Sequence, residues 1–189
     1  MVVDEATSCY SDAPPGQWNT GTAGGYAGSY RYETTSWLTQ TAVFSPCVTS
    51  PIPEDGYYEV QAHWSVHSAR PSAVPYTVHY NGGTATVYVD ESLDADGNVL
   101  ADFDPSGWYP LGVWPFKAGT GASTGEYVEL NSSSAGDTCA DAVRWIRSTA
   151  PSVSGPPYTV TVSSDPTELP SDGVSTASIC ITVTDIYGN

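Results

Sequence analysis

The alternation of residue types between Tyr57 and Val66 is the feature that most constrains how this chain folds. Every second position carries an apolar or aromatic side chain, and the positions between them are mostly polar. Side chains of a β-strand point alternately to opposite faces, so this pattern predicts a strand with one buried face. The predicted inward set is Tyr58, Val60, Ala62, Trp64 and Val66, and the outward set is Tyr57, Glu59, Gln61, His63 and Ser65.

The same alternation recurs along the chain between turn residues. Residues 76–80 alternate and lead into Asn81-Gly82-Gly83, which supplies the positive-φ residues of a tight hairpin, and residues 84–90 return as the partner strand. Short strands between Gly, Pro, Asn and Ser turns, with no helical stretch, predict a β-sandwich or jelly roll. Further strands are predicted at Val2–Ala6, Tyr30–Thr34, Thr41–Ser45, Trp108–Phe116, Glu126–Leu130 and Cys139–Ile146.

The aromatic content excludes a disordered chain. Six Trp, 13 Tyr and three Phe occur among the 189 residues, whereas disordered segments contain few aromatic residues. The chain also has 19 Val against six Leu, and Val and aromatic residues favour strands over helices. We therefore predict a globular, all-β protein.

The charge balance excludes two classes of partner. Five Lys and Arg stand against 21 Asp and Glu, which gives a formal net charge of −16. Binding to a phosphate backbone or to an anionic membrane surface requires clustered basic residues, and the five here are scattered. No apolar run approaches the roughly 18 residues of a membrane span. We predict neither nucleic-acid binding nor membrane insertion. Because the N-terminus lacks the pattern of an export signal, we expect a removed signal or an excised fragment.

Residues 1–147 form the first predicted domain, and most of it resembles the golvesin C-terminal or xanthan-lyase carbohydrate-binding-like domain. The resemblance implies a jelly-roll β-sandwich that is attached to larger secreted proteins and has no catalytic activity. It extends over residues 2–147 and is carried in order by VVDEA, GQWNTGTAGGYAGSYRY, PEDGYYEVQAHW, VPYTVHYNGGTATVYVDES, GWYPLGVWPFKAGTGASTGEYVEL and CADAVRWI.

Residues 148–157 are rich in Pro and Ser and indicate a linker. Residues 158–189 resemble the first strands of a bacterial immunoglobulin-like domain of the invasin or intimin type. They amount to two or three strands, well short of the ~100 residues of a complete domain. We therefore expect this segment to dock on the first domain or to be completed by a neighbouring chain. In the second case a strand with Ile179, Ile181 and Val183 on one face would be donated to the neighbour.

The four cysteines indicate an extracellular chain. Cys9, Cys47, Cys139 and Cys180 have no CxxC spacing, so a zinc knuckle is not predicted. An acidic chain with almost no Lys is typical of the extracellular space or cell surface, where disulfides persist. Three cysteines lie in the first domain, so at most one pair forms there. Cys9–Cys47 is the preferred pair, and Cys9–Cys139 stays open as the alternative.

Two groups of carboxylates are candidate calcium sites. The sequence Asp94-Ala95-Asp96-Gly97-Asn98 is followed by Asp102 and Asp104, and oxygen ligands at this spacing suit the flexible coordination of Ca²⁺. The alternative is a solvated acidic hairpin tip that binds no ion. Asp4 and Asp141 are the second candidate, because the first and last strands of such sandwiches often pair. The alternative there is that the carboxylates cap backbone N–H groups.

Exposed aromatic rings are candidate glycan contacts, because sugar rings stack their apolar faces on Trp and Tyr. The alternative is that these rings pack beneath long loops, whereas Trp64 and Trp145 lie on strands and are expected in the core. The candidate glycan-binding residues are Trp18, Tyr26, Tyr30, Trp108 and Tyr109.

No catalytic site is predicted. GASTG at residues 121–125 matches G-x-S-x-G, but a nucleophile elbow needs a strand before it and a helix after it, and here a strand follows. His63, His67 and His79 are expected at the surface, and no carboxylate pair can be placed across a cleft from the sequence.

We predict a non-catalytic structural or adhesive module of a large secreted or cell-surface protein, whose partners are neighbouring copies or adjacent immunoglobulin-like domains. One alternative is a subunit of an extracellular filament assembled by strand donation through residues 158–189. The other is a carbohydrate-binding module attached to a polysaccharide-degrading enzyme, with a polysaccharide as partner. Ca²⁺ is the one predicted cofactor.

Overall fold

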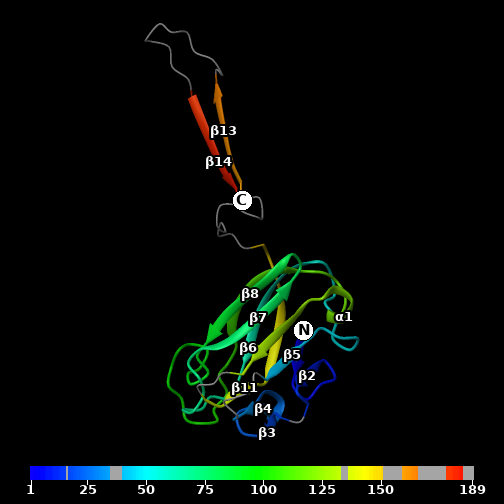
Figure 1. The fold of residues 1–189 in the computed structure, drawn as a ribbon, viewed down its shortest axis with the longest axis vertical. Helices are drawn as coiled ribbons and strands as arrows, with labels where there is room; N and C mark the ends of the chain where they lie inside the picture. The colour runs from blue at the N-terminus through cyan, green and yellow to red at the C-terminus, as the bar shows by residue number, and fades with distance from the viewer. Residues whose placement is uncertain (16, 35–39, 133–135, 151–158, 166–177, 185–189) are drawn as a thin grey trace. The chain divides into compact units, whose positions relative to one another are not determined.

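The computed structural model describes residues 1–15, 17–34, 40–132, 136–150, 159–165 and 178–184. It divides into two compact units, residues 1–149 and residues 150–189 (Figure 1). The strands of the first unit are β1 (Val2–Asp4), β2 (Tyr10–Ala13), β3 (Asn19–Gly21), β4 (Tyr30–Glu33), β5 (Thr41–Phe44), β6 (Gly56–His63), β7 (Val74–Tyr80), β8 (Gly83–Val89), β9 (Tyr109–Phe116), β10 (Tyr127–Asn131), β11 (Thr138–Ala140) and β12 (Ala142–Ser148). Two single-turn helices, η1 (Tyr26–Gly28) and α1 (Gly121–Thr124), lie between strands.

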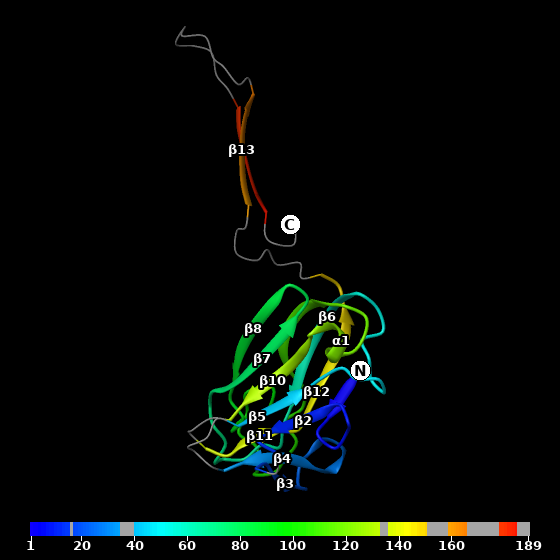
Figure 2. The ribbon, with the colours of Figure 1, turned by 45° about the vertical axis from the view of Figure 1, so that its right-hand side comes forward.

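Two antiparallel sheets form the body of the first unit. One has the order β1-β12-β6-β9 and the other the order β2-β5-β10-β7-β8, and the apolar core is drawn from both (Figure 2). A third sheet, β11-β4-β3, lies at one end. This arrangement confirms the predicted all-β sandwich. The largest buried core side chains from the two main sheets and the loops beside them are Trp64, Trp145, Tyr58, Tyr76, Phe44, Phe116, Ile52 and Leu130.

The alternating pattern of residues 57–66 corresponds to β6 and the segment after it. Tyr58, Val60 and Ala62 are buried as predicted, and so is Trp64 just past the strand. The prediction that His63 lies at the surface is wrong, because η1 and the segment before β9 cover this end of the sheet. The rings of Tyr26 and Trp108 lie 5.9 Å and 5.4 Å from the His63 ring.

The predicted strand Cys139–Ile146 is two strands. β11 pairs with β4, whereas β12 pairs with β1 and β6, so the chain passes from one sheet to another at Asp141. The sequence analysis also missed β2 and β3. The crossing point lies next to the end of β1. Asp4 pairs with Ala142, and the Glu5 N–H donates to the Asp141 carbonyl at 2.9 Å, so Asp4 and Asp141 are neighbours.

The second unit contains β13 (Thr159–Asp165) and β14 (Ser178–Thr184), which pair antiparallel along their whole length. The side chains of Ile179, Ile181 and Val183 lie outside the described part of the structure. The immunoglobulin-like character of residues 158–189 and the donation of a strand stay predictions. Among the described residues, no helix has the length and apolar character needed to cross a membrane.

Candidate functional site

A cavity of about 230 Å³ lies between the three-stranded sheet and the loops after β6 and before β9. We call it the aromatic cavity. Tyr30 and Tyr32 come from the same face of β4, because residues two apart on a strand point the same way. Their ring centroids are 5.9 Å apart, and the buried Arg70 guanidinium lies over both rings. The residues that line the cavity are Thr20, Gly21, Tyr30, Tyr32, His67, Arg70, Phe103 and Asp137.

Buried contacts hold this wall of the cavity in place. Arg70 donates to the carbonyl oxygens of Ser65 at 3.2 Å and Asp137 at 2.8 Å, so its side chain is fixed at both ends of the guanidinium. Gly21 lacks a side chain for a steric reason, since a Cβ there would lie 2.1 Å from Cζ of Tyr30. One edge of the Tyr30 ring is therefore packed against Gly21.

Phe103 is the exposed aromatic side chain of the cavity. It is 44% exposed, and its φ of 69° lies in the left-handed region, which bulky residues rarely adopt. The Phe103 N–H donates to the Val66 carbonyl at 2.6 Å, and the Val66 N–H donates to the Asp104 carbonyl at 2.9 Å. These two hydrogen bonds join the Phe103 segment to Val66, and the centroid of the Phe103 ring lies 4.7 Å from that of His67. Strained backbone of this kind concentrates at binding and catalytic sites.

The structure separates the predicted glycan residues into different environments. Trp18 and Tyr30 are buried, so neither presents a free ring face, and the prediction of exposed stacking rings is wrong for these two residues. Tyr109 is half-buried and packs against Trp64, with ring centroids 6.0 Å apart. Tyr26 and Trp108 come together at 5.2 Å, but Arg144 lies over the Trp108 ring at 4.2 Å and covers one of its faces.

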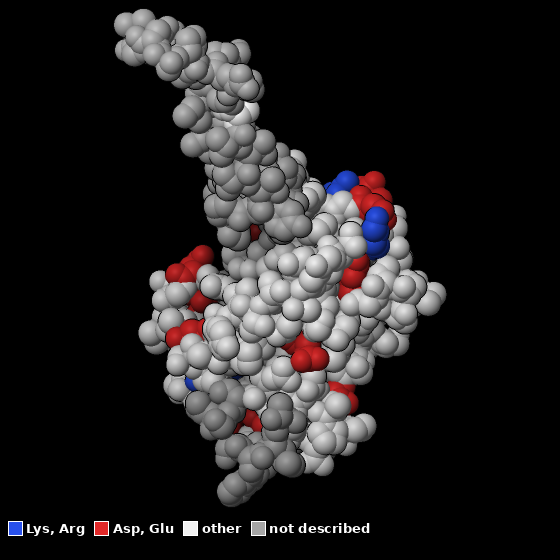
Figure 3. Space-filling model, turned by 45° about the horizontal axis from the view of Figure 1, so that its top comes forward, with Lys and Arg blue, Asp and Glu red and all other residues white. Residues whose placement is uncertain are grey.

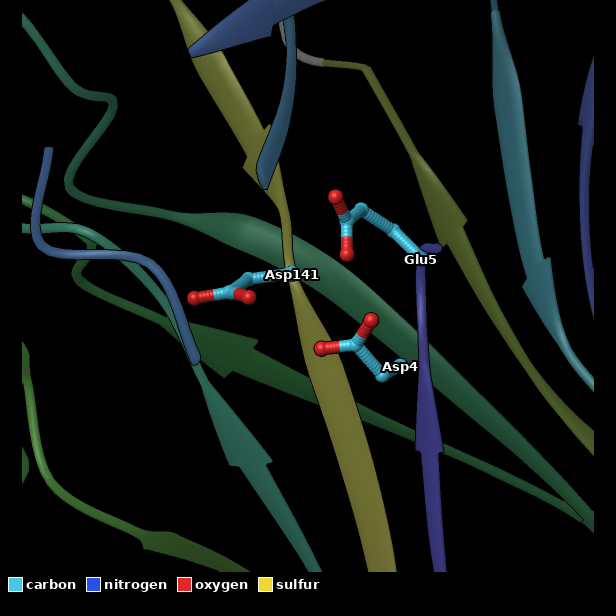
Figure 4. A group of neighbouring side chains, drawn as sticks. All are labelled: Asp4, Glu5 and Asp141. Carbon is cyan, nitrogen blue, oxygen red and sulfur yellow. The ribbon is translucent and has the colours of Figure 1, made fainter. Parts of the chain in front are cut away.

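Three buried carboxylates meet beside Tyr26 and His63. Asp4 ends β1, Glu5 follows it, and Asp141 precedes β12, and one oxygen of each lies within 4.8 Å of the others (Figure 4). We call these residues the carboxylate cluster. The Tyr26 N–H donates to both Asp141 oxygens, at 3.1 Å and 3.0 Å, and His63 Nδ1 lies 2.7 Å from Asp141 Oδ2. The cluster contains both residues of the second predicted calcium site and adds Glu5.

Burial changes the acidity of this cluster. Desolvation raises the pKa of Glu5 to about 7, and the neighbouring charge of Asp4 acts in the same direction against the hydrogen bond from Ser29. Desolvation also raises the pKa of Asp141 to about 6, although His63 opposes the shift. Removing a carboxylate from water disfavours its charged form, and this raises its pKa.

The residues of the first predicted calcium loop are divided between two loops. Asp94 Oδ1 accepts hydrogen bonds from the N–H groups of Asp96 and Asn98, at 3.0 Å and 2.7 Å. Asp102 lies with another loop, where its Oδ1 accepts the Ser68 N–H at 2.8 Å, a hydrogen bond that lowers its pKa. The group of three metal-type ligands found among the described residues is the carboxylate cluster.

The disulfide joins Cys9 to Cys47, which confirms the preferred pairing. Cys139 is a buried thiol whose pKa is raised by burial. Cys9 precedes the edge strand β2 and Cys47 follows its partner β5, so the bond fastens the edge of the five-stranded sheet. A disulfide is typical of extracellular proteins.

The other candidate residues lie as follows. Ser123 of the GASTG sequence donates to the Thr120 carbonyl at 2.8 Å as part of the cap of α1. His67 is partly exposed beside Asp102, with 3.6 Å between Nε2 and Oδ2. His79 is half-buried and stacks on Tyr127 at 4.0 Å. None of these contacts pairs a nucleophile with a base among the described residues.

Sequence reasoning missed Tyr32, Arg70, Phe103 and Glu5. The spacing of Tyr30 and Tyr32 in the predicted strand was a usable signal, because it places both rings on one face. A positive φ at Phe103 leaves no trace in the sequence. Glu5 follows Asp4 in the sequence but was not singled out; β1 ends at Asp4 and the chain turns there, and the Glu5 carboxylate lies close to that of Asp4.

Comparison with known proteins places these features in a family. Residues 1–147 match the family model of the golvesin C-terminal domain. A xanthan lyase of Bacillus sp. (strain GL1) is 28% identical over 149 residues, which are 77% of this chain and 14% of that protein. The solved structure of a Paenibacillus xanthan lyase superposes with a TM-score of 0.63 at 26% identity, over 78% of this chain and 13% of that one. This chain therefore spans a small part of the length of these relatives. Because the family model covers most of its residues, the chain belongs to the golvesin C-terminal domain family.

Proposed function

We propose that this chain is a non-catalytic carbohydrate-binding module of a larger secreted protein, and that one sugar unit of a polysaccharide is held in the aromatic cavity. The observation that carries the proposal is Phe103, an exposed aromatic ring held in a left-handed backbone conformation at the cavity. A solvent-exposed apolar ring in strained backbone has no role in packing the core.

The cavity has the two kinds of surface that a sugar needs. Apolar C–H faces of a sugar ring pack on aromatic rings, which Phe103 and Tyr32 supply. Hydroxyl groups need donors and acceptors, and Thr20, His67 and Asp137 line the same cavity. Its volume of about 230 Å³ lies below the roughly 300–1,000 Å³ of sites for whole drug-sized ligands, so it suits a single ring of a longer chain.

The relatives support the same proposal. Two of them are named xanthan lyases, and this chain matches only 14% and 13% of their lengths. A module of this size beside a lyase suits the delivery of an enzyme to its polysaccharide. The net charge of −16 and the acidic side chains spread over the face in Figure 3 disfavour polyanionic chains at low salt, so we expect neutral polysaccharides to bind more tightly.

Substitution of Phe103 tests the cavity. We expect Phe103→Ala to weaken binding about fivefold, because it removes stacking worth about 1 kcal/mol and a tenfold change corresponds to about 1.4 kcal/mol. Affinity electrophoresis in gels that contain xanthan or a neutral polysaccharide, followed by calorimetry on the best binder, measures the effect. Tyr88→Ala removes a 66% exposed ring from β8 and is the matched control.

A second variant separates binding from folding. Phe103→Gly removes the ring and also relieves the backbone, since glycine adopts positive φ without steric cost. Its melting temperature should equal or exceed that of the wild type while its affinity falls as in Phe103→Ala. Wild-type affinity in both variants, with a polysaccharide that binds the wild type, would contradict the proposed site.

A structural or adhesive role is the second proposal, and the β13–β14 ribbon supports it. In the described part of the chain β14 pairs with β13 alone, so its other edge is a surface to which a neighbouring strand can add. Under this proposal the chain forms concentration-dependent oligomers at a cell surface, and removal of residues 150–189 abolishes them. Light scattering of both forms measures this, and a monomeric full-length chain at high concentration would reject it.

A further inference from the structure

The carboxylate cluster concentrates buried negative charge at the junction of β1 and β12. Asp4, Glu5 and Asp141 are 6%, 8% and 1% exposed. None of the ion pairs among the described residues joins Asp4 or Glu5 to a Lys or Arg side chain, and His63 is paired with Asp141. Buried carboxylates without a cationic partner are costly, so such a group either holds protons or binds a cation.

Two oxygens in the cluster have no hydrogen-bond donor. The Ala6 N–H donates to Asp4 Oδ1 at 2.9 Å, and the Ser29 hydroxyl donates to Glu5 Oε1 at 2.6 Å. The other oxygen of each group, Asp4 Oδ2 and Glu5 Oε2, is buried and unpartnered. Figure 4 shows the carboxylates of Asp4 and Glu5 facing one another, with Asp141 beside them. Each of these two carboxylates thus has one oxygen with a donor and one buried oxygen without a donor.

We propose that Asp4, Glu5 and Asp141 bind one divalent cation, and that Ca²⁺ is the preferred ion. Carboxylate oxygens are hard ligands, which Ca²⁺ and Mg²⁺ prefer. Ca²⁺ accepts irregular sets of six to eight oxygens, so water can complete the shell that three carboxylates begin. Mg²⁺ demands a regular octahedron and gives up its water reluctantly, which suits a buried site less well.

The position of the cluster gives the ion a structural effect. The ion would join β1 to the start of β12. These two strands lie near opposite ends of the sequence of the first unit. Asp141 also accepts both hydrogen bonds from the Tyr26 N–H, so the ion would fix η1 and the Tyr26–Trp108 contact at the same time. Because the ion binds the folded state, it should raise the melting temperature.

The first test measures stability with the metal alone. The full chain is treated with EDTA, dialysed, and melted with CaCl₂, MgCl₂ or neither. At calcium about 100-fold above Kd we expect a rise of about 5–10 °C. Glu5→Gln should abolish this rise, while Asp94→Asn, which alters the rival acidic loop, should retain it.

A second readout does not depend on stability. Tb³⁺ often replaces Ca²⁺ and is sensitised by nearby Tyr and Trp rings, and Tyr26 and Trp108 lie next to the cluster. Tb³⁺ luminescence that Ca²⁺ displaces should be present in the wild type and in Asp94→Asn and lost in Glu5→Gln. The proposal is overturned by the absence of any calcium response at millimolar concentration, by a response that survives Glu5→Gln, or by a larger shift with Mg²⁺.

Discussion

Removal of the Cys9–Cys47 disulfide is expected to lower the free energy of unfolding of the first unit by about 4 kcal/mol. The two cysteines are 38 residues apart, and a cross-link of that span restricts the unfolded chain by roughly this amount in the chain-entropy estimate. The bond also fastens the edge strand β2 to β5, whose register runs from Tyr10–Phe44 to Ala13–Thr41. Hydrogen exchange should therefore accelerate first in β2.

Urea unfolding of a Cys9→Ala/Cys47→Ala double variant measures this loss. Tryptophan fluorescence reports on the first unit alone, because all six tryptophans precede residue 149. The wild type treated with dithiothreitol should reach the midpoint of the double variant, and the double variant should not respond to the reductant. A midpoint within error of the oxidised wild type would show that the bond contributes nothing to stability.

The strands that pack the core could be predicted because their sequence alternates. Residues 57–66 and the hairpin around Asn81 follow this pattern, and the structure has β6, β7 and β8 there. The strands β2 and β3 were missed because YSDA and NTG carry no apolar alternation. Such short strands are held by pairing with β5 and β4, and a pairing partner cannot be read from a local window.

The break at Asp141 shows a second limit of local reading. A single Asp inside an otherwise apolar run looks like one outward-facing strand position. Its side chain is instead nearly fully buried, because β11 and β12 belong to different sheets and the chain changes partner there. Alternation also placed His63 on the solvent face, but Tyr26 of η1 and Trp108 before β9 cover it.

The candidate sites differ in how much of each could be predicted from the sequence. The first calcium candidate was easy to notice because Asp94, Asp96 and Asn98 are close in sequence. The Asp94 carboxylate, however, already accepts hydrogen bonds from backbone N–H groups of its own turn. Asp4 and Asp141 lie 137 residues apart, and only the pairing of β1 with β12 brings them together. The aromatic cavity required a backbone conformation at Phe103 that composition does not encode.

Glu91 leads to the second prediction with a large effect. It is fully buried, its Oε1 accepts a hydrogen bond from the Tyr76 hydroxyl at 2.9 Å, and its Oε2 accepts the Cys139 N–H at 2.7 Å. Burial raises the pKa of Glu91 to about 7, and Asp141 adds to the shift, while Arg70 and the two hydrogen bonds oppose it. The folded protein therefore binds a proton at Glu91 more tightly than the unfolded chain, whose glutamates titrate near 4.5.

The sign of the pH dependence follows from this difference. Between about pH 4.5 and 7 the folded state holds the proton and the unfolded state has lost it, so the stability that Glu91 contributes is full below this window and falls as pH rises through it. Each pKa unit corresponds to about 1.4 kcal/mol, which gives a loss of about 3 kcal/mol across the window.

Glu91→Gln should remove this loss. The amide keeps an oxygen for the Cys139 N–H and places its NH₂ toward the Tyr76 oxygen, so it resembles protonated Glu91 at every pH. Any difference in packing between the amide and the protonated carboxyl shifts the stability by an offset that does not vary with pH, and the slope between pH 5 and 8 is therefore the decisive quantity. Urea unfolding in EDTA at pH 5, 6, 7 and 8 should show the wild type losing about 2.5 kcal/mol relative to the variant, because part of the loss already lies below pH 5. Glu54→Gln, at a largely exposed position, should keep the wild-type slope. Parallel curves for Glu91→Gln and the wild type would mean that Glu91 is ionised in the folded state at pH 5, and that Arg70 outweighs the cost of its burial.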